Sequence, residues 1–258
     1  MEKLSIWSEN QEVRFRAVDT SDSMTLSAVF DFFQEAAISH AENLSVGRSD
    51  MARANQVWIL SRMSVQIDRR PKYGEIITVR TWPRGGEKLF ALRDYDIRDA
   101  DGNAAVRARS CWVIIDREKR RPLRPQSVMS LMPLNEGLDS LSAAVGLEEN
   151  TLLQKTAERR AMYTDMDYNG HVNNVSYIRW IEDALDSSLL ENAQYMRLDI
   201  NYLNEVLLNE VIGIWTAPVA PAAGESPHIH AFAIEGKKEQ GEKAAQTAFR
   251  AELRLSKM

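Results

Sequence analysis

Residues 165–180 read DMDYNGHVNNVSYIRW and place four polar side chains at two-residue intervals, namely Asp165, Asp167, Asn169 and His171. Alternate residues of an extended segment point to the same side, so the last three are expected to project together. Asn169-Gly170 indicates a turn. The run 172–185 is rich in apolar residues and long enough for a helix, which would put His171 at or just before its N-terminus.

A helix N-terminus carries unpaired backbone N–H groups and the positive end of the helix dipole, which favour a negatively charged oxygen. Acyl transfer needs a carboxylate, an imidazole, an orienting amide and N–H donors for an oxyanion. We therefore expect the backbone N–H groups of His171 and Val172 to stabilise an oxyanion. Asp165 is expected to cap or orient, and Asn173 and Asn174 to have structural roles.

The pattern Asp-x-Asn-x-His-Val-Asn-Asn of residues 167–174, followed by an apolar helix, resembles the active-site motif of acyl-acyl-carrier-protein (acyl-ACP) thioesterases of the bacterial type. The resemblance implies a hot-dog fold, an antiparallel sheet wrapped around one long helix. It also implies release of fatty acids from acyl carrier protein (ACP) in fatty acid biosynthesis. The His-Val-Asn-Asn part is shared more widely among hot-dog thioesterases, so the narrower assignment depends on the rest of the chain.

The bulk properties are those of an ordinary globular protein. The 258 residues could form one large domain or two small ones, and a net charge of -5 gives no general attraction to nucleic acid or anionic membranes. Cys111 is the only cysteine, which excludes an intrachain disulfide and fits a reducing compartment. It lies in an apolar run, so we expect a buried, inert thiol. Without a signal or transit segment or a membrane span, we expect a cytoplasmic protein.

The order of elements suggests a helix followed by an antiparallel sheet. A strand is predicted at 12–18, then a helix that begins after Thr25 or Ser27 and runs to about Asn43, with His40 exposed on it. A polar loop is expected at 44–56. Four strands should follow, at 57–69, 75–83, 88–98 and 104–116. Residues 126–156 show no strand pattern and contain a predicted short helix near 138–145.

The second half of the chain repeats the first. An offset of 147 aligns Glu35 with Glu182, Phe30 with Tyr177 and Phe33 with Trp180, and an offset of 135 aligns residues 62–65 with 197–200. We therefore predict an α+β fold with two tandem hot-dog units. The N-terminal unit is expected at 1–125, a connection at 126–156 and the C-terminal unit at 157–258. The drop in offset leaves about 12 extra residues in the 44–56 loop, which either covers an acyl pocket or is a plain surface loop.

The two halves differ in their polar residues. The offset of 147 puts Met24 opposite His171, Asp22 opposite Asn169 and Thr20 opposite Asp167, while the offset of 135 puts Arg70 opposite Glu205. The first half thus lacks the imidazole and has a guanidinium in place of a carboxylate. We infer one active site per chain, in the C-terminal half. The N-terminal half would supply acyl-binding surface, and the aromatic candidates for substrate contact are Phe30, Phe33, Tyr177 and Trp180.

Glu205 also follows from the resemblance, because Tyr202-Leu203-Asn204-Glu205 matches the position of a catalytic Glu in the family. In plant members a Cys typically follows that Glu, whereas this chain has Val206, which excludes a cysteine nucleophile there. The implied catalytic set is Asp167, Asn169, His171 and Glu205. Asp167 would act as base or nucleophile, His171 would polarise the thioester or exchange protons, Asn169 would hold the geometry, and Glu205 would orient water or the catalytic group.

No metal or other cofactor is implied, because His228 and His230 share one strand face without an evident third ligand. A basic run at the end of the predicted N-terminal unit is either a solvated segment that leaves the sheet or a docking site for acidic ACP; its members are Arg117, Lys119, Arg120, Arg121 and Arg124. Two other functions stay open, a hot-dog acyl-CoA thioesterase and a non-catalytic acyl- or ACP-binding protein. The oligomeric state is also open, and a homodimer is compatible with the sequence.

Overall fold

The computed structural model describes residues 2–142, 144–220, 228–239 and 245–256. Within these residues one antiparallel sheet runs in the order β1-β3-β4-β5-β2-β8-β11-β10-β9-β7, with β6 added beside β5. The strands are β1 (Trp7–Glu12), β2 (Gln56–Ile67), β3 (Ile76–Glu87), β4 (Phe90–Arg98), β5 (Ala104–Asp116), β6 (Arg121–Leu123), β7 (Gln154–Arg160), β8 (Tyr195–Tyr202), β9 (Val211–Val219), β10 (Ile229–Lys238) and β11 (Gln246–Ser256).

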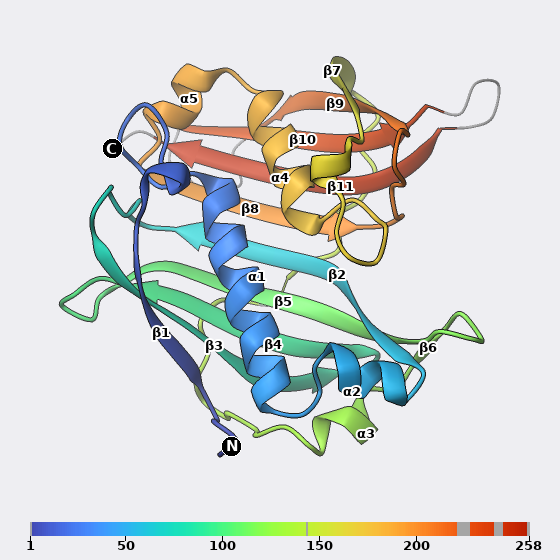
Figure 1. Ribbon diagram of the computed structural model, residues 1–258. Helices are drawn as coiled ribbons and strands as arrows, with labels where there is room; N and C mark the ends of the chain where they lie inside the picture. The colour runs from blue at the N-terminus through green and yellow to red at the C-terminus, as the bar shows by residue number, and fades with distance from the viewer. Residues whose placement is uncertain (1, 143, 221–227, 240–244, 257–258) are drawn as a thin grey trace.

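Each half of the sheet curves around one helix, α1 (Leu26–Asn43) or α4 (Asn174–Asp183) (Figure 1). The two helices pack against each other on the same side of the sheet and run in opposite directions. Their apolar sides join one continuous core that extends through both halves. This is the α+β arrangement of two tandem hot-dog units that the sequence predicts, so the predicted fold class is confirmed.

The two units are related by a pseudo-twofold axis that passes between β2 and β8. Ser64 lies directly opposite Asp199 in this strand pair and donates a hydrogen bond to its carboxylate. These two residues are also equivalent in the repeat, because 199 − 64 gives the predicted offset of 135. The pairing of β2 with β8 therefore joins the units into one sheet.

Around the helices the offset is 148 and not the predicted 147. The N–H of Met24 donates to Pro71 O and that of Val172 to Val206 O, an equivalent pair of bonds for which 172 − 24 = 148 and 206 − 71 = 135. The N-caps agree, since Thr25 caps α1 and Asn173 caps α4. The one-residue error arose from matching Glu35 with Glu182, although Glu35 is exposed and carries no packing constraint.

The extra residues of the first unit do not form the polar loop predicted at 44–56. They lengthen α1, which has 18 residues against 10 in α4, and they form the short helix α2 (Arg48–Arg53). The added part of α1 carries His40, which is fully buried and not exposed as predicted. Its ring lies between Leu4 O, at 2.9 Å from Nε2, and Arg93 Nη1, at 3.0 Å from Nδ1.

Two further predicted elements are wrong. Residues 15–17 form a short 3-10 turn with Phe15 exposed, and the strand of this region is the more polar β1, which pairs with β3 at the edge of the described sheet. The described residues of 138–145 form no helix. They cross the sheet of the first unit, where Asp139 pairs with Arg84 and Arg109, while the connection contains the short helix α3 (Gln126–Met129) instead.

The described helices were also compared with the dimensions of a bilayer. The longest, α1, has 18 residues and includes polar and charged side chains along its length. None of the helices in the described ranges is both long and apolar enough to cross a membrane.

Candidate active site

The loop before α4 is a tight turn held by one carboxylate. Asp167 Oδ1 accepts hydrogen bonds from the N–H of Asn169 at 2.7 Å and of His171 at 3.3 Å, and Oδ2 accepts one from Asn169 Nδ2 at 3.2 Å. Gly170 has φ +80, a conformation that a residue without a side chain adopts without strain. The segment that was predicted to be extended is therefore a turn, in which Asp167 and Asn169 hold the backbone that presents His171.

His171 pairs with Glu205 across the site. Nε2 of the imidazole lies 3.1 Å from Oε2 of the carboxylate, and the two side chains are 35% and 55% exposed. Glu205 lies just beyond β8, and the hydrogen bond from Val172 N to Val206 O fixes the two backbones beside each other. An imidazole paired with a carboxylate at the surface of the protein can accept a proton from water and pass it on.

The four predicted catalytic residues thus form two pairs, Asp167 with Asn169 and His171 with Glu205. Asp167 contacts the backbone of His171, and no hydrogen bond joins its carboxylate to the imidazole among the described residues. Asp165 has the capping role expected of it, since its Oδ2 accepts from Met162 N at 2.8 Å.

The predicted oxyanion donors are not free in this arrangement. The N–H of His171 donates to Asp167 Oδ1, and that of Val172 donates to Val206 O at 2.9 Å. Asn173 Oδ1 accepts from Val175 N at 2.8 Å, as an N-cap residue does. Within the described part of the chain, the N–H of Asn174, the first residue of α4, has no acceptor. The N–H without an acceptor at this helix end is therefore that of Asn174, and oxyanion binding by His171 and Val172 stays a prediction.

The first unit contains the same turn with different chemistry. At an offset of 148, Asp19 corresponds to Asp167, Ser21 to Asn169 and Ser23 to His171, in place of the predicted Thr20, Asp22 and Met24. Asp19 Oδ1 accepts from the N–H groups of Ser21, at 2.9 Å, and Ser23, at 3.4 Å. The turn is thus retained without the imidazole.

Arg70 takes the place of Glu205 and fills this counterpart site. Its side chain is 3% exposed and pairs with Asp19. It also donates to the carbonyl oxygens of Met24 at 2.9 Å, Leu190 at 3.0 Å and Ser23 at 3.1 Å. The guanidinium therefore closes the N-terminal turn and ties it to the second unit, and only the C-terminal turn has an imidazole–carboxylate pair.

Comparison with protein families decides which of the hot-dog proteins this chain resembles. The model of the acyl-ACP thioesterase N-terminal domain matches residues 5–129, and that of the C-terminal domain matches residues 149–251. The chain belongs to the acyl-ACP thioesterase family. The two matches follow each other along the chain in the order of the two observed units, and the predicted boundaries at 125 and 157 stay predictions.

Individual proteins agree with the family assignment. The chain is 27% identical to palmitoyl-acyl carrier protein thioesterase of Gossypium hirsutum over 214 residues, 78% of this chain and 52% of that protein. It is 23% identical to oleoyl-acyl carrier protein thioesterase 1 of Arabidopsis thaliana over 240 residues, 84% of this chain and 65% of that protein. The chain spans about half of the length of the first of these relatives.

Solved structures show the same fold. An acyl-ACP thioesterase from Bacteroides thetaiotaomicron superposes with a TM-score of 0.80 at 23% identity, covering 98% of both chains. The 12:0-ACP thioesterase from Umbellularia californica superposes with a TM-score of 0.77 at 21% identity, covering 97% of this chain and 93% of that one.

The aromatic residues predicted to contact substrate are buried in the core. Phe33 packs against Tyr95 with ring centroids 4.9 Å apart, and Tyr177 packs edge to face against Trp180 at 5.3 Å. Burial raises the pKa of Tyr177, and the nearby carboxylates of Glu210, Asp167 and Glu205 raise it further. Tyr177 therefore connects the core with the active-site turn, and substrate contact by these residues stays a prediction.

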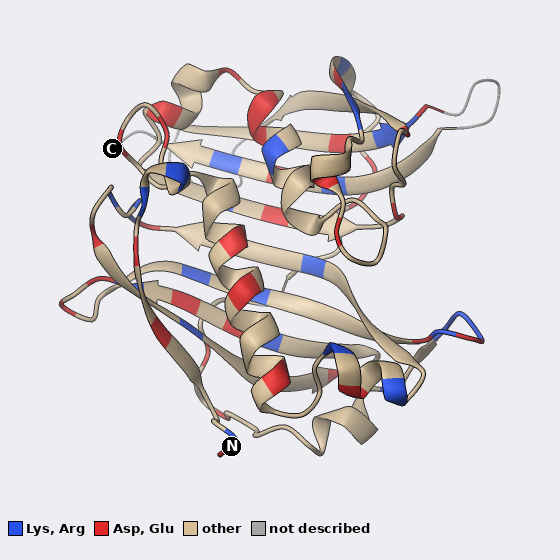
Figure 2. Ribbon diagram, viewed as in Figure 1, with Lys and Arg blue, Asp and Glu red and all other residues tan. Residues whose placement is uncertain are grey.

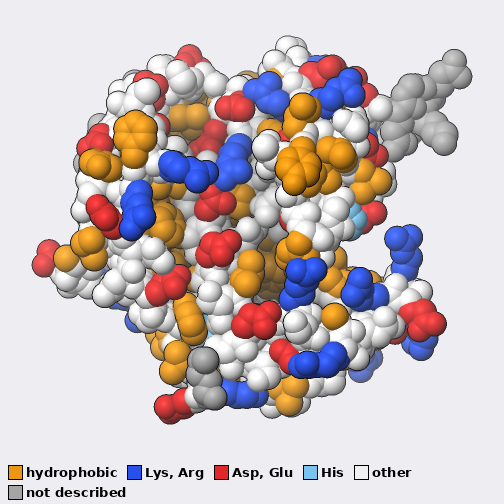
Figure 3. All heavy atoms as spheres, in the orientation of Figure 1, with side chains coloured by type: hydrophobic (Ala, Val, Ile, Leu, Met, Phe, Trp, Pro, Cys, Tyr) orange, Lys and Arg blue, Asp and Glu red, His pale blue; other side chains and the backbone are white. Residues whose placement is uncertain are grey.

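Two residues that the sequence did not single out join the units at the site. The Arg48 guanidinium of α2 lies over the ring of Tyr168, 3.9 Å from its centroid, and Tyr168 stands in the turn between Asp167 and Asn169. A space-filling view shows a hollow between the units, with hydrophobic side chains in its depth and Lys and Arg side chains along one border (Figure 3). Arg48 lies in no motif, and Tyr168 fills a variable position of the Asp-x-Asn-x-His pattern, so no sequence signal identified either residue.

The basic run forms the turn between β5 and β6 and its continuation (Figure 2). Its five basic residues are all exposed, and none has an ion pair within the described ranges. Arg124 lines a cavity of about 340 Å³ together with Lys88, which comes from the turn between β3 and β4. The sequence did not predict that Lys88 lies beside the basic run.

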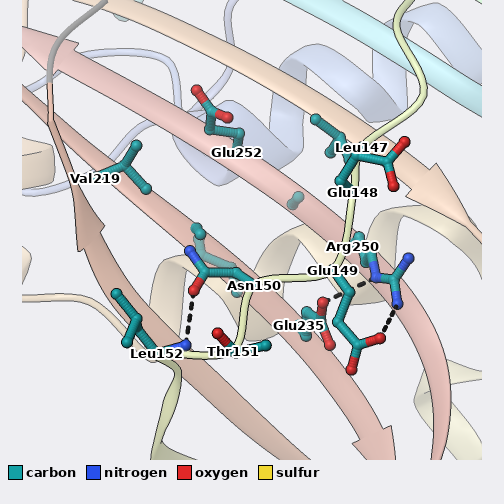
Figure 4. Close-up of a pocket in the computed structure, with 13 residues that line it drawn as sticks. Leu147, Glu148, Glu149, Asn150, Thr151, Leu152, Val219, Glu235, Arg250 and Glu252 are labelled. Atoms are coloured by element: carbon teal, nitrogen blue, oxygen red, sulfur yellow. Dashed lines mark hydrogen bonds and ion pairs between the residues drawn. The ribbon is translucent and has the colours of Figure 1, made fainter.

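A second cavity, of about 360 Å³, lies away from these residues, between the segment 147–152 and strands β9, β10 and β11 (Figure 4). Arg250 crosses it and pairs with Glu235 at 2.8 Å and with Glu149 at 3.6 Å. No group of three or more His, Cys, Asp and Glu side chains that could hold a metal ion occurs in the described residues.

Proposed function

We propose that this protein hydrolyses fatty acyl-ACP thioesters to a free fatty acid and ACP. Membership of the acyl-ACP thioesterase family supports the substrate class. The observation that carries the proposal is the His171–Glu205 pair at 3.1 Å. The equivalent residues of the first unit are Ser23 and Arg70. Hydrolysis is assigned to the C-terminal unit for this reason.

In this proposal, water attacks the thioester carbonyl carbon while His171 accepts its proton, and Glu205 orients and stabilises the imidazolium that forms. The carbon–sulfur bond then breaks, and the proton passes from His171 to the leaving thiolate. Asn169 and Asp167 hold the turn. A direct role for Asp167, as base or nucleophile, would use Oδ2, which accepts a single hydrogen bond, from Asn169 Nδ2, among the described residues.

Oxygen labelling tests the role of Asp167. A single turnover in H₂¹⁸O places ¹⁸O in the fatty acid if water attacks the thioester directly. If Asp167 is the nucleophile, a mixed anhydride forms as the thiolate leaves. Water attack on its aspartyl carbon then puts the label in the protein and an unlabelled carboxylate oxygen in the fatty acid, whereas attack on its acyl carbon labels the fatty acid, so that trapping the anhydride with hydroxylamine is needed to separate this route from direct attack.

The substrate class is tested with a panel of acyl-ACPs and the matching acyl-CoAs, by measuring free fatty acid and free thiol. We expect release from acyl-ACP with the higher kcat/KM. A preference for acyl-CoA would support an acyl-CoA thioesterase, and tight binding of acyl-ACP without any release would support a non-catalytic binding protein.

We also propose that ACP docks on the basic run between β5 and β6. ACP is acidic, and a thioesterase with net charge -5 must attract it through a local basic surface. Replacing both Arg120 and Arg121 with Glu should raise KM for acyl-ACP, most at low salt, and leave hydrolysis of an acyl-pantetheine nearly unchanged. The matched control replaces the exposed Arg14 and Arg16 with Glu. Equal effects of the two double variants would refute the docking site.

A further inference from the structure

The pseudo-twofold axis relates the two central helices residue by residue. Asp31 of α1 and Arg179 of α4 are equivalent, since 179 − 31 = 148, and they pair with each other at 2.7 Å. A contact between equivalent residues lies on the axis. For every other contact between a residue of α1 and a residue of α4, the two residues at the equivalent positions, found with the offset of 148, therefore face each other in the same way.

One such contact places a carboxylate on the N-terminus of α1. Glu182 of α4 accepts hydrogen bonds through Oε1 from Leu26 N at 2.8 Å and Ser27 N at 3.3 Å. Burial of this carboxyl raises its pKa, against the opposing effect of the hydrogen bonds from Ser27 and Leu26. The N-terminus of α1, in the unit without an imidazole, thus already binds a carboxyl oxygen from the other unit.

The counterpart of Glu182 is Gln34, and the counterpart of Leu26 is Asn174, both at an offset of 148. Gln34 is half-buried, and its side chain has no hydrogen-bond partner among the described residues. α4 begins beside the middle of α1, as the twofold relation requires (Figure 1). At the catalytic helix end, an amide therefore stands where the other end has a carboxylate, and the Asn174 N–H is left without an acceptor.

We propose that Gln34, from the N-terminal unit, is a catalytic residue of the C-terminal site, where its side-chain N–H and the Asn174 N–H bind the thioester carbonyl oxygen. The inference rests on the proposed hydrolysis and assigns the first unit a direct part in it. When water adds to the carbonyl carbon, the electron pair of the C=O bond moves to this oxygen, and both donors face the charge that develops. This electron pair re-forms the C=O bond when the carbon–sulfur bond breaks.

The difference between Gln34 and Glu182 explains why only the N-terminus of α4, and not that of α1, can bind the thioester carbonyl oxygen. A carboxylate at position 34 would accept the Asn174 N–H, as Glu182 accepts the Leu26 N–H, and would repel the oxyanion. A neutral amide leaves the N–H free and adds a second donor. Arg70 and Glu182 thus occupy the turn and the helix end of the first unit, at the places where the second unit has Glu205 and Gln34.

The test compares Gln34→Ala, Gln34→Glu and the control Glu35→Ala, which changes the next, exposed residue of the same helix. Removing a donor to an oxyanion typically lowers kcat by about 100-fold or more. On acyl-ACP we expect such a loss in kcat for Gln34→Ala with KM little changed, a greater loss for Gln34→Glu, and wild-type kcat for Glu35→Ala. A wild-type kcat for Gln34→Ala would overturn the inference.

Binding of dodecanoate separates this inference from the proposed function, because the carboxylate of the probe presents a negatively charged oxygen to the same donors. The amide resonance of Asn174 should shift when dodecanoate binds, and Gln34→Ala should raise its Kd by about 10-fold. If the wild type binds dodecanoate in this way but releases no fatty acid from acyl-ACP, the oxygen site stands and the proposed function fails. If Kd is unchanged in Gln34→Ala, or the Asn174 resonance does not move, the inference fails.

Discussion

Arg70 and Glu205 occupy equivalent places in the two units, and exchanging each for a neutral residue should have opposite consequences. Arg70→Met should lower stability and leave a folded protein able to turn over substrate. Glu205→Gln should leave stability nearly unchanged and lower kcat by about 100-fold, the usual scale for a group that assists proton transfer. The contrast follows from burial, because the Arg70 side chain is 3% exposed and that of Glu205 is 55% exposed.

The loss in stability can be estimated from the contacts of Arg70. Removing one partner of a buried ion pair costs about 3–5 kcal/mol, since the other charge stays buried without compensation. Asp19 keeps its hydrogen bonds from Ser21 and is 18% exposed, so we expect about 3 kcal/mol. For a protein of this size that corresponds to a decrease in Tm of about 6–12 °C.

Chemical denaturation of Arg70→Met measures this loss. The control is Arg107→Met, which breaks the exposed pair with Asp68 and should cost less than about 1 kcal/mol. Burial raises the pKa of Asp19, but the hydrogen bonds from Arg70 and Ser21 outweigh it and hold that pKa below its usual value. The stabilisation is therefore present at neutral pH and lost as the pH falls through the lowered pKa. An Arg70→Met protein that is as stable as Arg107→Met, or stable but inactive, would refute this reasoning.

Three other predictions concern groups around the site. Because burial raises the pKa of Glu182, the free energy of unfolding should fall as pH rises from about 4.3, the ordinary value for Glu, toward that raised pKa. Urea unfolding at a series of pH values should show that this free energy changes less with pH in Glu182→Gln. Cys111→Ser should retain turnover and lose about 1–3 kcal/mol, because it buries a hydroxyl; a stable, inactive variant would contradict the imidazole–carboxylate mechanism. Arg48→Ala should lower kcat/KM a few-fold by freeing the turn at Tyr168, with Arg53→Ala as control; equal values for the two variants would show that the contact is incidental.

Local patterns predicted the elements that their own residues determine. α1 was found because its apolar stripe and the capping Thr25 lie within one segment, and both of its ends agree with the structure. The turn around Asp167 was indicated by Asn169-Gly170, whereas the spacing of the polar residues predicted an extended backbone, which the segment does not have. Burial of Cys111 is confirmed for the same reason, since the apolar run around it becomes the interior of β5.

Contacts between distant residues account for what the sequence did not predict. His40 is buried because Arg93 and Leu4 O, both remote in the chain, satisfy its ring nitrogens. The N–H groups of His171 and Val172 were expected to be free, but the acceptor for Val172 comes from the segment after β8. A one-residue error in the repeat likewise concealed that Ser23 is the counterpart of His171.

Release of free fatty acid from acyl-ACP by His171→Ala and Ser23→Ala tests the central claim most directly. These residues are equivalent in the two units, and only His171 carries an imidazole paired with a carboxylate. We expect His171→Ala to lower kcat by about 100-fold or more and Ser23→Ala to leave it within about 3-fold of the wild type, with both proteins folded. Equal losses in the two folded variants, or full activity of His171→Ala, would contradict a single active site in the C-terminal unit.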